Sequence, residues 1–230
     1  MSEEVLRLIL AVAVLVFSCV FHECAHVWMA WKFGDPTGRQ MGRLTLNPLP
    51  HIDVFWTILL PVFTFLQSGY PIGGPKPAPV NTHLMDDPRL GGVSSALAGP
   101  ASNLVLALGG LGLLALLRSV VPGLVEPDSI NALLFFYIWF INGALALINL
   151  IPVPPLDGSR VLHWIVGRPL DRLMEFVDGA GWITAIPIYL AFRYLAPYVL
   201  GPFAAGTWYL LEAFFGGEYA EALWATFTGS

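Results

Sequence analysis

Two histidines and a glutamate near the start of the chain have the types and spacing of a metal site. They lie in HECAH, residues 22 to 26, where His22 and His26 are four residues apart. In a helix this spacing is about one turn, so both imidazoles share a face and can bind one zinc ion together. Glu23, beside the first histidine, can then act as the general base that removes a proton from a zinc-bound water.

A catalytic zinc site also needs a third protein ligand and an open position for water. We predict that Asp157 is this ligand. It lies in NLIPVPPLDGSR, residues 149 to 160, where prolines interrupt helical hydrogen bonding and Gly158 permits a tight turn. Two ordinary alternatives remain at this point. Asp157 can cap the helix that follows, and the histidines can belong to a packed core without a metal.

The composition predicts that the elements that position these residues lie in a membrane. Hydrophobic residues make up 56% of the chain and charged residues 12%, against roughly 45 to 50% and about 25% in soluble domains. An ionisable side chain at bilayer depth costs about 2.5 to 3.5 kcal/mol, so three of them in one apolar helix favour a divalent cation as their partner. The eleven Lys and Arg are scattered singly, which excludes a basic nucleic-acid surface.

Long apolar runs predict where the chain crosses the membrane. The run at 5–31 contains HECAH, and it exceeds the roughly 20 residues that a crossing requires. Runs at 92–117 and 131–151 are also long enough, and residues 182–199 should form a further crossing. The sequence leaves open whether the tail, 203–226, is a last crossing or an interfacial helix.

The places of the ligands predict the directions of the helices. HECAH lies near the end of the first run and Asp157 follows the end of the third, so these two helices should be parallel, with 92–117 opposed to both. The helix at 92–117 must then start on the side where the first helix ends, so residues 54–81 cannot cross the membrane once. We predict that they form a re-entrant Gly/Pro-rich hairpin. The expected fold class is an all-α integral membrane protein, a polytopic bundle of about 4–6 transmembrane helices with this hairpin.

The positive charges predict the orientation of this bundle. Eight of the eleven Lys and Arg fall on the side of the HECAH site and three fall opposite. Positive residues favour the cytoplasmic side of a membrane, so the site should open toward the cytoplasm. The eight are Lys32, Arg39, Arg43, Lys76, Arg89, Arg160, Arg168 and Arg172, and the three are Arg7, Arg118 and Arg193.

Three separated motifs resemble, in type and order, those of the site-2 protease family of intramembrane zinc metalloproteases. They are HECAH, AGPASN at 98–103 and NLIPVPPLDG at 149–158. GDPTGRQMGRLTLNPLPHID, at 34–53, is similar to the compact bacterial branch without PDZ or CBS domains. One departure is that HECAH lies in the first predicted crossing, whereas many members have a crossing before it.

The resemblance implies roles for five residues. His22, His26 and Asp157 would bind one catalytic zinc ion, and Glu23 would be the general base. Asn149 would be a further catalytic group that steadies the substrate or the oxyanion. Asn103 is a weaker candidate, since packing between helices also explains it. Structural or interfacial roles are expected for the remaining histidines, His51, His83 and His163.

The resemblance also implies an activity and a place in the cell. The protein would hydrolyse peptide bonds of transmembrane protein substrates within the lipid bilayer, as in regulated intramembrane proteolysis, and would lie in the bacterial inner membrane. Residues 1–230 would be a single membrane-embedded metalloprotease domain, with a catalytic core at about 5–165 and C-terminal helices at about 166–230.

Two other functions remain open from the sequence. One is a non-proteolytic membrane metal-binding protein or transporter, and the other is a membrane metalloenzyme that acts on something other than protein. A transporter more often shows paired repeats and several charges at mid-membrane. Neither feature is evident in the sequence, which favours the enzyme.

Overall fold

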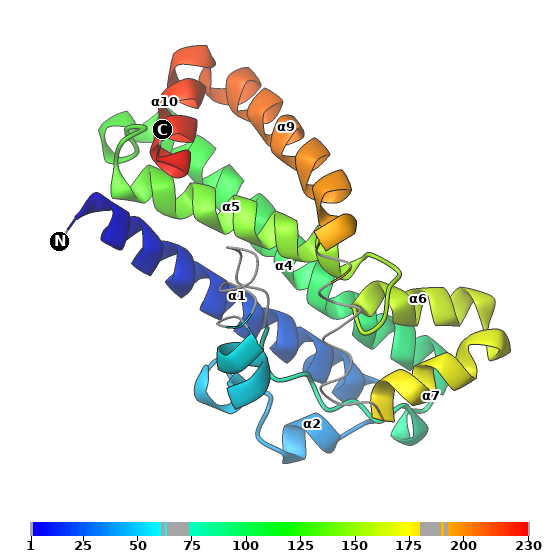
Figure 1. The fold of residues 1–230 in the computed structure, drawn as a ribbon. Coiled ribbons are helices and arrows are strands. Elements are labelled where there is room, and N and C mark those ends of the chain that lie inside the picture. Colours follow the sequence, from blue (N-terminus) through cyan, green and yellow to red (C-terminus); the bar gives the residue numbers. More distant parts are fainter. Residues whose placement is uncertain (1, 61–62, 64–73, 180–189, 191–192, 230) are drawn as a thin grey trace.

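The computed structural model describes residues 2–60, 63, 74–179, 190 and 193–229, and in this part every regular element is a helix (Figure 1). Three helices are long: α1 (Glu3–Lys32), α4 (Pro88–Val120) and α5 (Ile130–Asn149). The others are α2 (Thr37–Gln40), α6 (Asp157–Val166), α7 (Asp171–Gly179), α9 (Ala196–Phe215) and α10 (Gly217–Thr228), with the short turns η1 (Leu49–His51), η2 (Val54–Leu59), η3 (Thr82–Leu84), η4 (Pro122–Leu124) and η5 (Arg168–Leu170).

Local sequence signals set the ends of the three long helices. Ser2, Asp87 and Ser129 stand at the N-caps of α1, α4 and α5, where their side-chain oxygens accept backbone N–H hydrogen bonds. Beyond α1 the chain turns at Gly34, whose φ of +99° strains any residue but glycine. Past α5, Pro152 cannot continue a helix.

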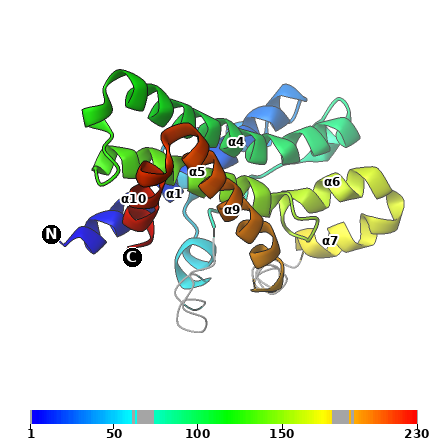
Figure 2. The ribbon, with the colours of Figure 1, turned by 90° about the horizontal axis from the view of Figure 1, so that it is seen from above.

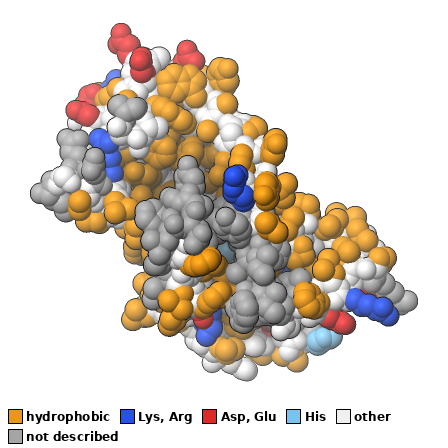
Figure 3. Space-filling model, in the orientation of Figure 1, with side chains coloured by type: hydrophobic (Ala, Val, Ile, Leu, Met, Phe, Trp, Pro, Cys, Tyr) orange, Lys and Arg blue, Asp and Glu red, His pale blue; other side chains and the backbone are white. Residues whose placement is uncertain are grey.

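The same three helices are long and apolar enough to cross a membrane. They confirm the first three predicted crossings. Apolar side chains such as Leu8, Phe17 and Val105 remain exposed on them, and hydrophobic side chains spread over much of the surface that Figure 3 shows. Such a surface is stable against lipid tails rather than water, so the protein is built as an integral membrane protein.

Helix α4 packs against both α1 and α5 and runs in the opposite direction to them (Figures 1 and 2). These are the directions that the ligand positions predict. Helix α9 then returns along α5, and α10 folds back toward it. The core between them contains Phe136 and Trp139 of α5 together with Leu211 and Leu223. These contacts hold α5 in place.

The tail at 203–226, whose place the sequence leaves open, is divided between two helices. Gly216, with a φ of +85°, ends α9 and lets α10 start in a new direction. Tyr219 of α10 then donates a hydrogen bond to the carbonyl of Val125 at 2.6 Å. The tail is thus two helices, α9 and α10, and whether it crosses the membrane stays open. The crossing predicted at 182–199 lies mostly outside the described residues.

One of the predicted charge positions also changes. Val199 and Leu200, in the first turns of α9, pack against Ile148 and Leu156 beside the C-terminal end of α5. Arg193 precedes α9 by three residues, so it lies on the side of the HECAH motif and not on the opposite side as the sequence predicts. The correction increases the charge difference between the two ends of the bundle.

The hairpin predicted at 54–81 is described only at its two ends, because residues 61–62 and 64–73 lie outside the described part. Gly74 N–H donates to the Trp56 carbonyl at 3.0 Å, and the Thr57 hydroxyl donates to the Gly74 carbonyl at 2.9 Å. The two ends therefore lie side by side.

Candidate metal centre

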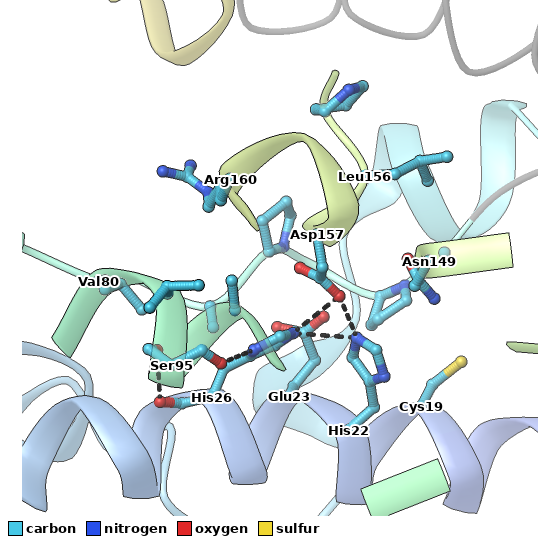
Figure 4. Close-up of a pocket in the computed structure, with 18 of the residues that line it drawn as sticks. Cys19, His22, Glu23, His26, Val80, Ser95, Asn149, Leu156, Asp157 and Arg160 are labelled. Atoms are coloured by element: carbon cyan, nitrogen blue, oxygen red, sulfur yellow. Dashed lines mark hydrogen bonds and ion pairs between the residues drawn. The ribbon is translucent and has the colours of Figure 1, made fainter. Parts of the chain in front are cut away.

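His22, His26 and Asp157 come together in the structure from the C-terminal half of α1 and the start of α6 (Figure 4). The two Nε2 atoms are 2.9 Å apart, and Asp157 Oδ2 lies 3.1 Å from His22 Nε2 and 3.4 Å from His26 Nε2. Ligand atoms about 2.0 to 2.1 Å from a tetrahedral zinc ion are about 3.3 to 3.4 Å apart. The three atoms are thus spaced much like three corners of such a site.

Helix α4 holds both imidazoles through residues spaced four apart along one face: Ser95, Gly99 and Asn103. The Ser95 carbonyl accepts a hydrogen bond from His26 Nδ1 at 2.7 Å, and Asn103 Oδ1 accepts one from His22 Nδ1. Gly99 leaves room between them, because a Cβ there would lie 2.6 Å from His22 Nε2 and closer still to His26 Nε2. The face of α4 is therefore shaped to the histidine pair.

These hydrogen bonds leave Nε2 of each ring available to a metal. Carbonyl oxygens only accept, so each Nδ1 carries the hydrogen and each Nε2 keeps its lone pair. The two Nε2 atoms and Asp157 Oδ2 then face one another as electron-rich atoms, and Asp157 Oδ2 has no other partner among the described residues than these two rings. That arrangement is repulsive unless a proton or a metal ion lies between the atoms, and the donor set and its spacing fit a zinc ion.

The part that α4 plays in the site is not evident from the sequence. The sequence predicts only a weak candidate at Asn103 and no role for Ser95 or Gly99. One signal for the group is visible in the sequence, because the four-residue interval between Ser95, Gly99 and Asn103 matches the interval between the two histidines. The interval alone does not show that the two helices pack face to face.

Asp157 reaches the histidines because α6 begins directly against the end of α5. A Cβ on Gly158 would lie 2.5 Å from the Leu150 carbonyl carbon and 2.7 Å from the Ile151 carbonyl oxygen, so glycine permits this approach. Leu156 holds the N-cap position of α6 without a side-chain hydrogen bond. The Asp157 carboxylate is turned toward the histidines, and the alternative role as a helix cap is not what the structure shows.

A cavity of about 1490 Å³ opens over the three ligands, and Glu23 contributes to its wall. Glu23 is only 7% exposed, and its Oε2 is buried without a hydrogen-bond partner among the described residues. A buried carboxylate oxygen is costly to leave unpaired. Glu23 therefore presents a free acceptor in the same cavity as the ligands, which suits a group that accepts a proton there.

Asn149 ends α5 and lines the same cavity. Its Nδ2 donates to the Leu145 carbonyl one turn earlier, at 2.9 Å. This bond fixes the plane of the amide and leaves the second hydrogen on Nδ2 for another partner. The position suits a polar contact to a substrate, and the catalytic role of Asn149 stays a prediction.

Two buried polar side chains support one wall of the cavity. Arg43, 4% exposed, donates from Nη2 to the carbonyls of Lys76 and Pro77. His51, 2% exposed, donates from Nε2 to the Thr45 carbonyl at 3.0 Å. Burial lowers the pKa of His51, and the positive charge of Arg43 acts in the same direction, so the ring is neutral near pH 7. His51 Nδ1 has no hydrogen-bond partner among the described residues and His51 lines the cavity, so the structural role expected of it stays a prediction.

The other two histidines lie at the edge of the cavity. His83 is exposed on η3, and His163 pairs through Nε2 with Asp171 Oδ1 at 2.7 Å. Neither belongs to the group of ligand atoms formed by His22, His26 and Asp157.

Apolar helices that enclose two histidines and a carboxylate beside a cavity define a membrane-embedded metalloenzyme. Residues 124–190, which include Asn149 and Asp157, match the model of peptidase family M50. The candidate zinc metalloprotease YwhC of Bacillus subtilis (strain 168) is 40% identical over 192 residues, which are 83% of this chain and 84% of that protein. The chain therefore belongs to peptidase family M50, the site-2 protease family, and is a zinc metalloprotease of that family.

Further relatives have the same description. The candidate zinc metalloprotease Rip2 of Mycolicibacterium smegmatis is 36% identical over 186 residues, or 79% of this chain and 67% of that protein. A candidate zinc metalloprotease of Synechocystis sp. is 48% identical over 96 residues, or 39% of this chain and 23% of that protein. No solved structure matches the chain significantly.

Proposed function

We propose that the protein hydrolyses peptide bonds of membrane-associated proteins, with His22, His26 and Asp157 holding one zinc ion and Glu23 as the general base. The observation that carries this proposal is the buried Glu23 Oε2, which has no hydrogen-bond partner among the described residues and lies in the cavity of the three ligands. A bound zinc ion supplies a Lewis acid that polarises a carbonyl and lowers the pKa of water to about 7. Membership of family M50 favours peptide hydrolysis over the alternatives that the sequence leaves open.

Each residue has a task in this reaction. Glu23 accepts a proton from the attacking water and passes it to the nitrogen of the leaving amine. The peptide bond then breaks without forming an amide anion. Asn149 donates its remaining Nδ2 hydrogen to the carbonyl oxygen of the substrate, where negative charge develops. Asn103 and the Ser95 carbonyl keep the imidazoles from rotating, so the ligand atoms are in place before a substrate arrives.

The substrate would be a transmembrane protein, as family membership suggests. A helix hides its carbonyls in internal hydrogen bonds, so the segment to be cut must unwind before it reaches Glu23. The adjacency of Trp56 and Gly74 supports a re-entrant hairpin over 54–81 beside the site. With this hairpin and a crossing near 182–199, the bundle would have about 4–6 transmembrane helices.

The protein would lie in the bacterial inner membrane with the site open to the cytoplasm. With Arg193 on the side of the site, nine of eleven positive residues, eight plus one, lie there, which supports this orientation. In intact cells, an impermeant thiol reagent should not label Gln40→Cys and should label Asp128→Cys at the other end. The unmodified protein, with Cys19 and Cys24, gives the background. Labelling of Gln40→Cys before the cells are opened would reverse the orientation.

The activity is tested by Glu23→Gln, which keeps the shape of the side chain and removes its basicity. We expect cleavage to fall by about 100- to 10,000-fold, while zinc measured by elemental analysis stays at the level of the unmodified protein. Cleavage is measured by enriching new protein N-termini from membranes of cells that express either form. Glu212→Gln on the exposed side of α9 is the matched control and should cleave normally. Equal sets of fragments from Glu23→Gln and unmodified protein would refute the mechanism.

A further inference from the structure

The hydrogen bond that His22 makes is the first of three in a row that lead away from the cavity. His22 Nδ1 donates to Asn103 Oδ1, Asn103 Nδ2 donates to Asn142 Oδ1 at 2.8 Å, and Asn142 Nδ2 donates to the Ile138 carbonyl at 2.9 Å. Asn103 is 0% exposed and Asn142 is 1% exposed. The row joins α1, α4 and α5, and it ends on the backbone of α5.

The direction of these hydrogen bonds follows from their last acceptor. The Ile138 carbonyl only accepts, so the Asn142 atom that faces it must be Nδ2, and Oδ1 must face Asn103. Asn103 then presents Nδ2 to Asn142, and the Ser18 carbonyl at 3.4 Å requires the same orientation. The Asn103 Oδ1 is thereby left for His22, which must donate from Nδ1. As a result His22 Nε2 keeps its lone pair toward the other ligand atoms.

We propose that Asn142 is a positioning residue for the metal centre, acting through Asn103 to fix which nitrogen of His22 can bind the metal. The inference rests on the proposed function, because it requires a metal ion at His22. Asn142 makes no contact with a substrate in this role, since neither it nor Asn103 is among the described residues that line the cavity. Its effect reaches the metal by orienting one amide, which in turn orients one imidazole.

A plain structural role is the competing explanation. Amides that pair across helices also hold membrane helices together, and Asn103 and Asn142 join α4 to α5. The two explanations differ in the expected effect on metal binding. A purely structural amide affects the stability of the bundle, whereas the positioning role changes the affinity and the coordination geometry of the metal even in protein that remains folded.

The experiment titrates metal-free, detergent-purified protein with Co²⁺, whose visible absorption reports coordination geometry. Asn142→Leu should weaken Co²⁺ binding about 10-fold and shift the absorption bands. Asn142→Asp should bind as the unmodified protein does, because the buried carboxyl is protonated and keeps both bonds: its O–H donates to the Ile138 carbonyl and its other oxygen accepts from Asn103. Thr207→Val is the matched control: it removes another buried hydrogen bond of α5, from Trp139 Nε1 at 3.1 Å, that does not lead to His22. It should lower the melting temperature but leave the Co²⁺ titration unchanged.

A second pair of variants keeps the test decisive. Asn142→Ala removes the amide without adding bulk, and it replaces the leucine variant if that variant does not purify. Adding Asn142→Ala to Asn103→Leu should weaken Co²⁺ binding no further than Asn103→Leu alone, because Asn142 acts only through Asn103. Normal affinity and bands in both Asn142→Leu and Asn142→Ala, or an equal change in Thr207→Val, would overturn the positioning role and leave the protease intact. Unmodified protein that binds no Co²⁺ would overturn both.

Discussion

Replacing Gly99 by alanine should weaken zinc binding although every ligand is retained. The added Cβ would lie 2.6 Å from His22 Nε2, whereas ordinary contacts begin at 3.4 Å, an overlap of 0.8 Å. The overlap with His26 Nε2 is larger. Both rings are held at Nδ1 by partners on α4 itself, so neither can move aside freely. At least one histidine must leave its position.

The size of the effect can be worked out for two separate measurements. A ring that swings away leaves a buried hydrogen bond unmade, which costs about 1 to 3 kcal/mol of folding stability, offset in part by about 1 kcal/mol of helix propensity gained on replacing glycine. Zinc binding to four ligands amounts to about 10 to 16 kcal/mol, or about 3 kcal/mol for each ligand. Losing one ligand therefore weakens zinc binding about 100-fold.

The assay is competition between the purified protein and a chromophoric zinc chelator, with thermal unfolding of the metal-free protein measured in parallel. Gly109→Ala is the matched control, because it lies on the same helix and its Cβ would meet nothing within 4 Å. It should be at least as stable as the unmodified protein and bind zinc normally. If Gly99→Ala held zinc as tightly as Gly109→Ala, the inferred fit of α4 to the histidines would be wrong.

Three further substitutions test the other parts of the site. Asp157→Ala should lower the bound zinc measured by elemental analysis, and full occupancy would show that Asp157 is not a ligand. Gly158→Ala should also weaken zinc in the chelator competition, because its Cβ would strike the carbonyls that end α5. Normal affinity would mean that α6 can shift without moving Asp157. Asn149→Ala should keep its zinc but cleave about 100-fold more slowly, and unchanged cleavage would remove Asn149 from the reaction.

The sequence predicts well what local rules decide. Residues 5–31 lie in α1 because a single apolar segment of that length can satisfy its backbone hydrogen bonds in a bilayer only as a helix. His22 and His26 share a face because the helical period is fixed. Asp157 could be singled out because the prolines before it end α5 and the glycine after it allows a close turn.

Contacts between distant segments could not be predicted in the same way. The hydrogen bond between His22 and Asn103 joins residues 81 positions apart. Several faces of α4 are apolar enough to pack against α1, so the sequence does not show that the face with Asn103 does so. The break at Gly216 was also hidden, because a glycine in an apolar helix can be either a packing site or an end. Arg193 was misplaced for a related reason, since its side depends on how the chain returns to α9.

The two histidines of the site are held by different kinds of group. Substitutions can therefore change the orientation of one histidine more easily than that of the other. His26 is oriented by the backbone carbonyl of Ser95, and a backbone group persists whatever side chain stands there. His22 is held by the side chain of Asn103, and through it by that of Asn142, so its orientation requires two particular side chains. A metal site of this design can be tuned at one ligand while the other stays fixed. The tuning residues lie inside the bundle, where they alter the metal without changing the cavity that a substrate enters.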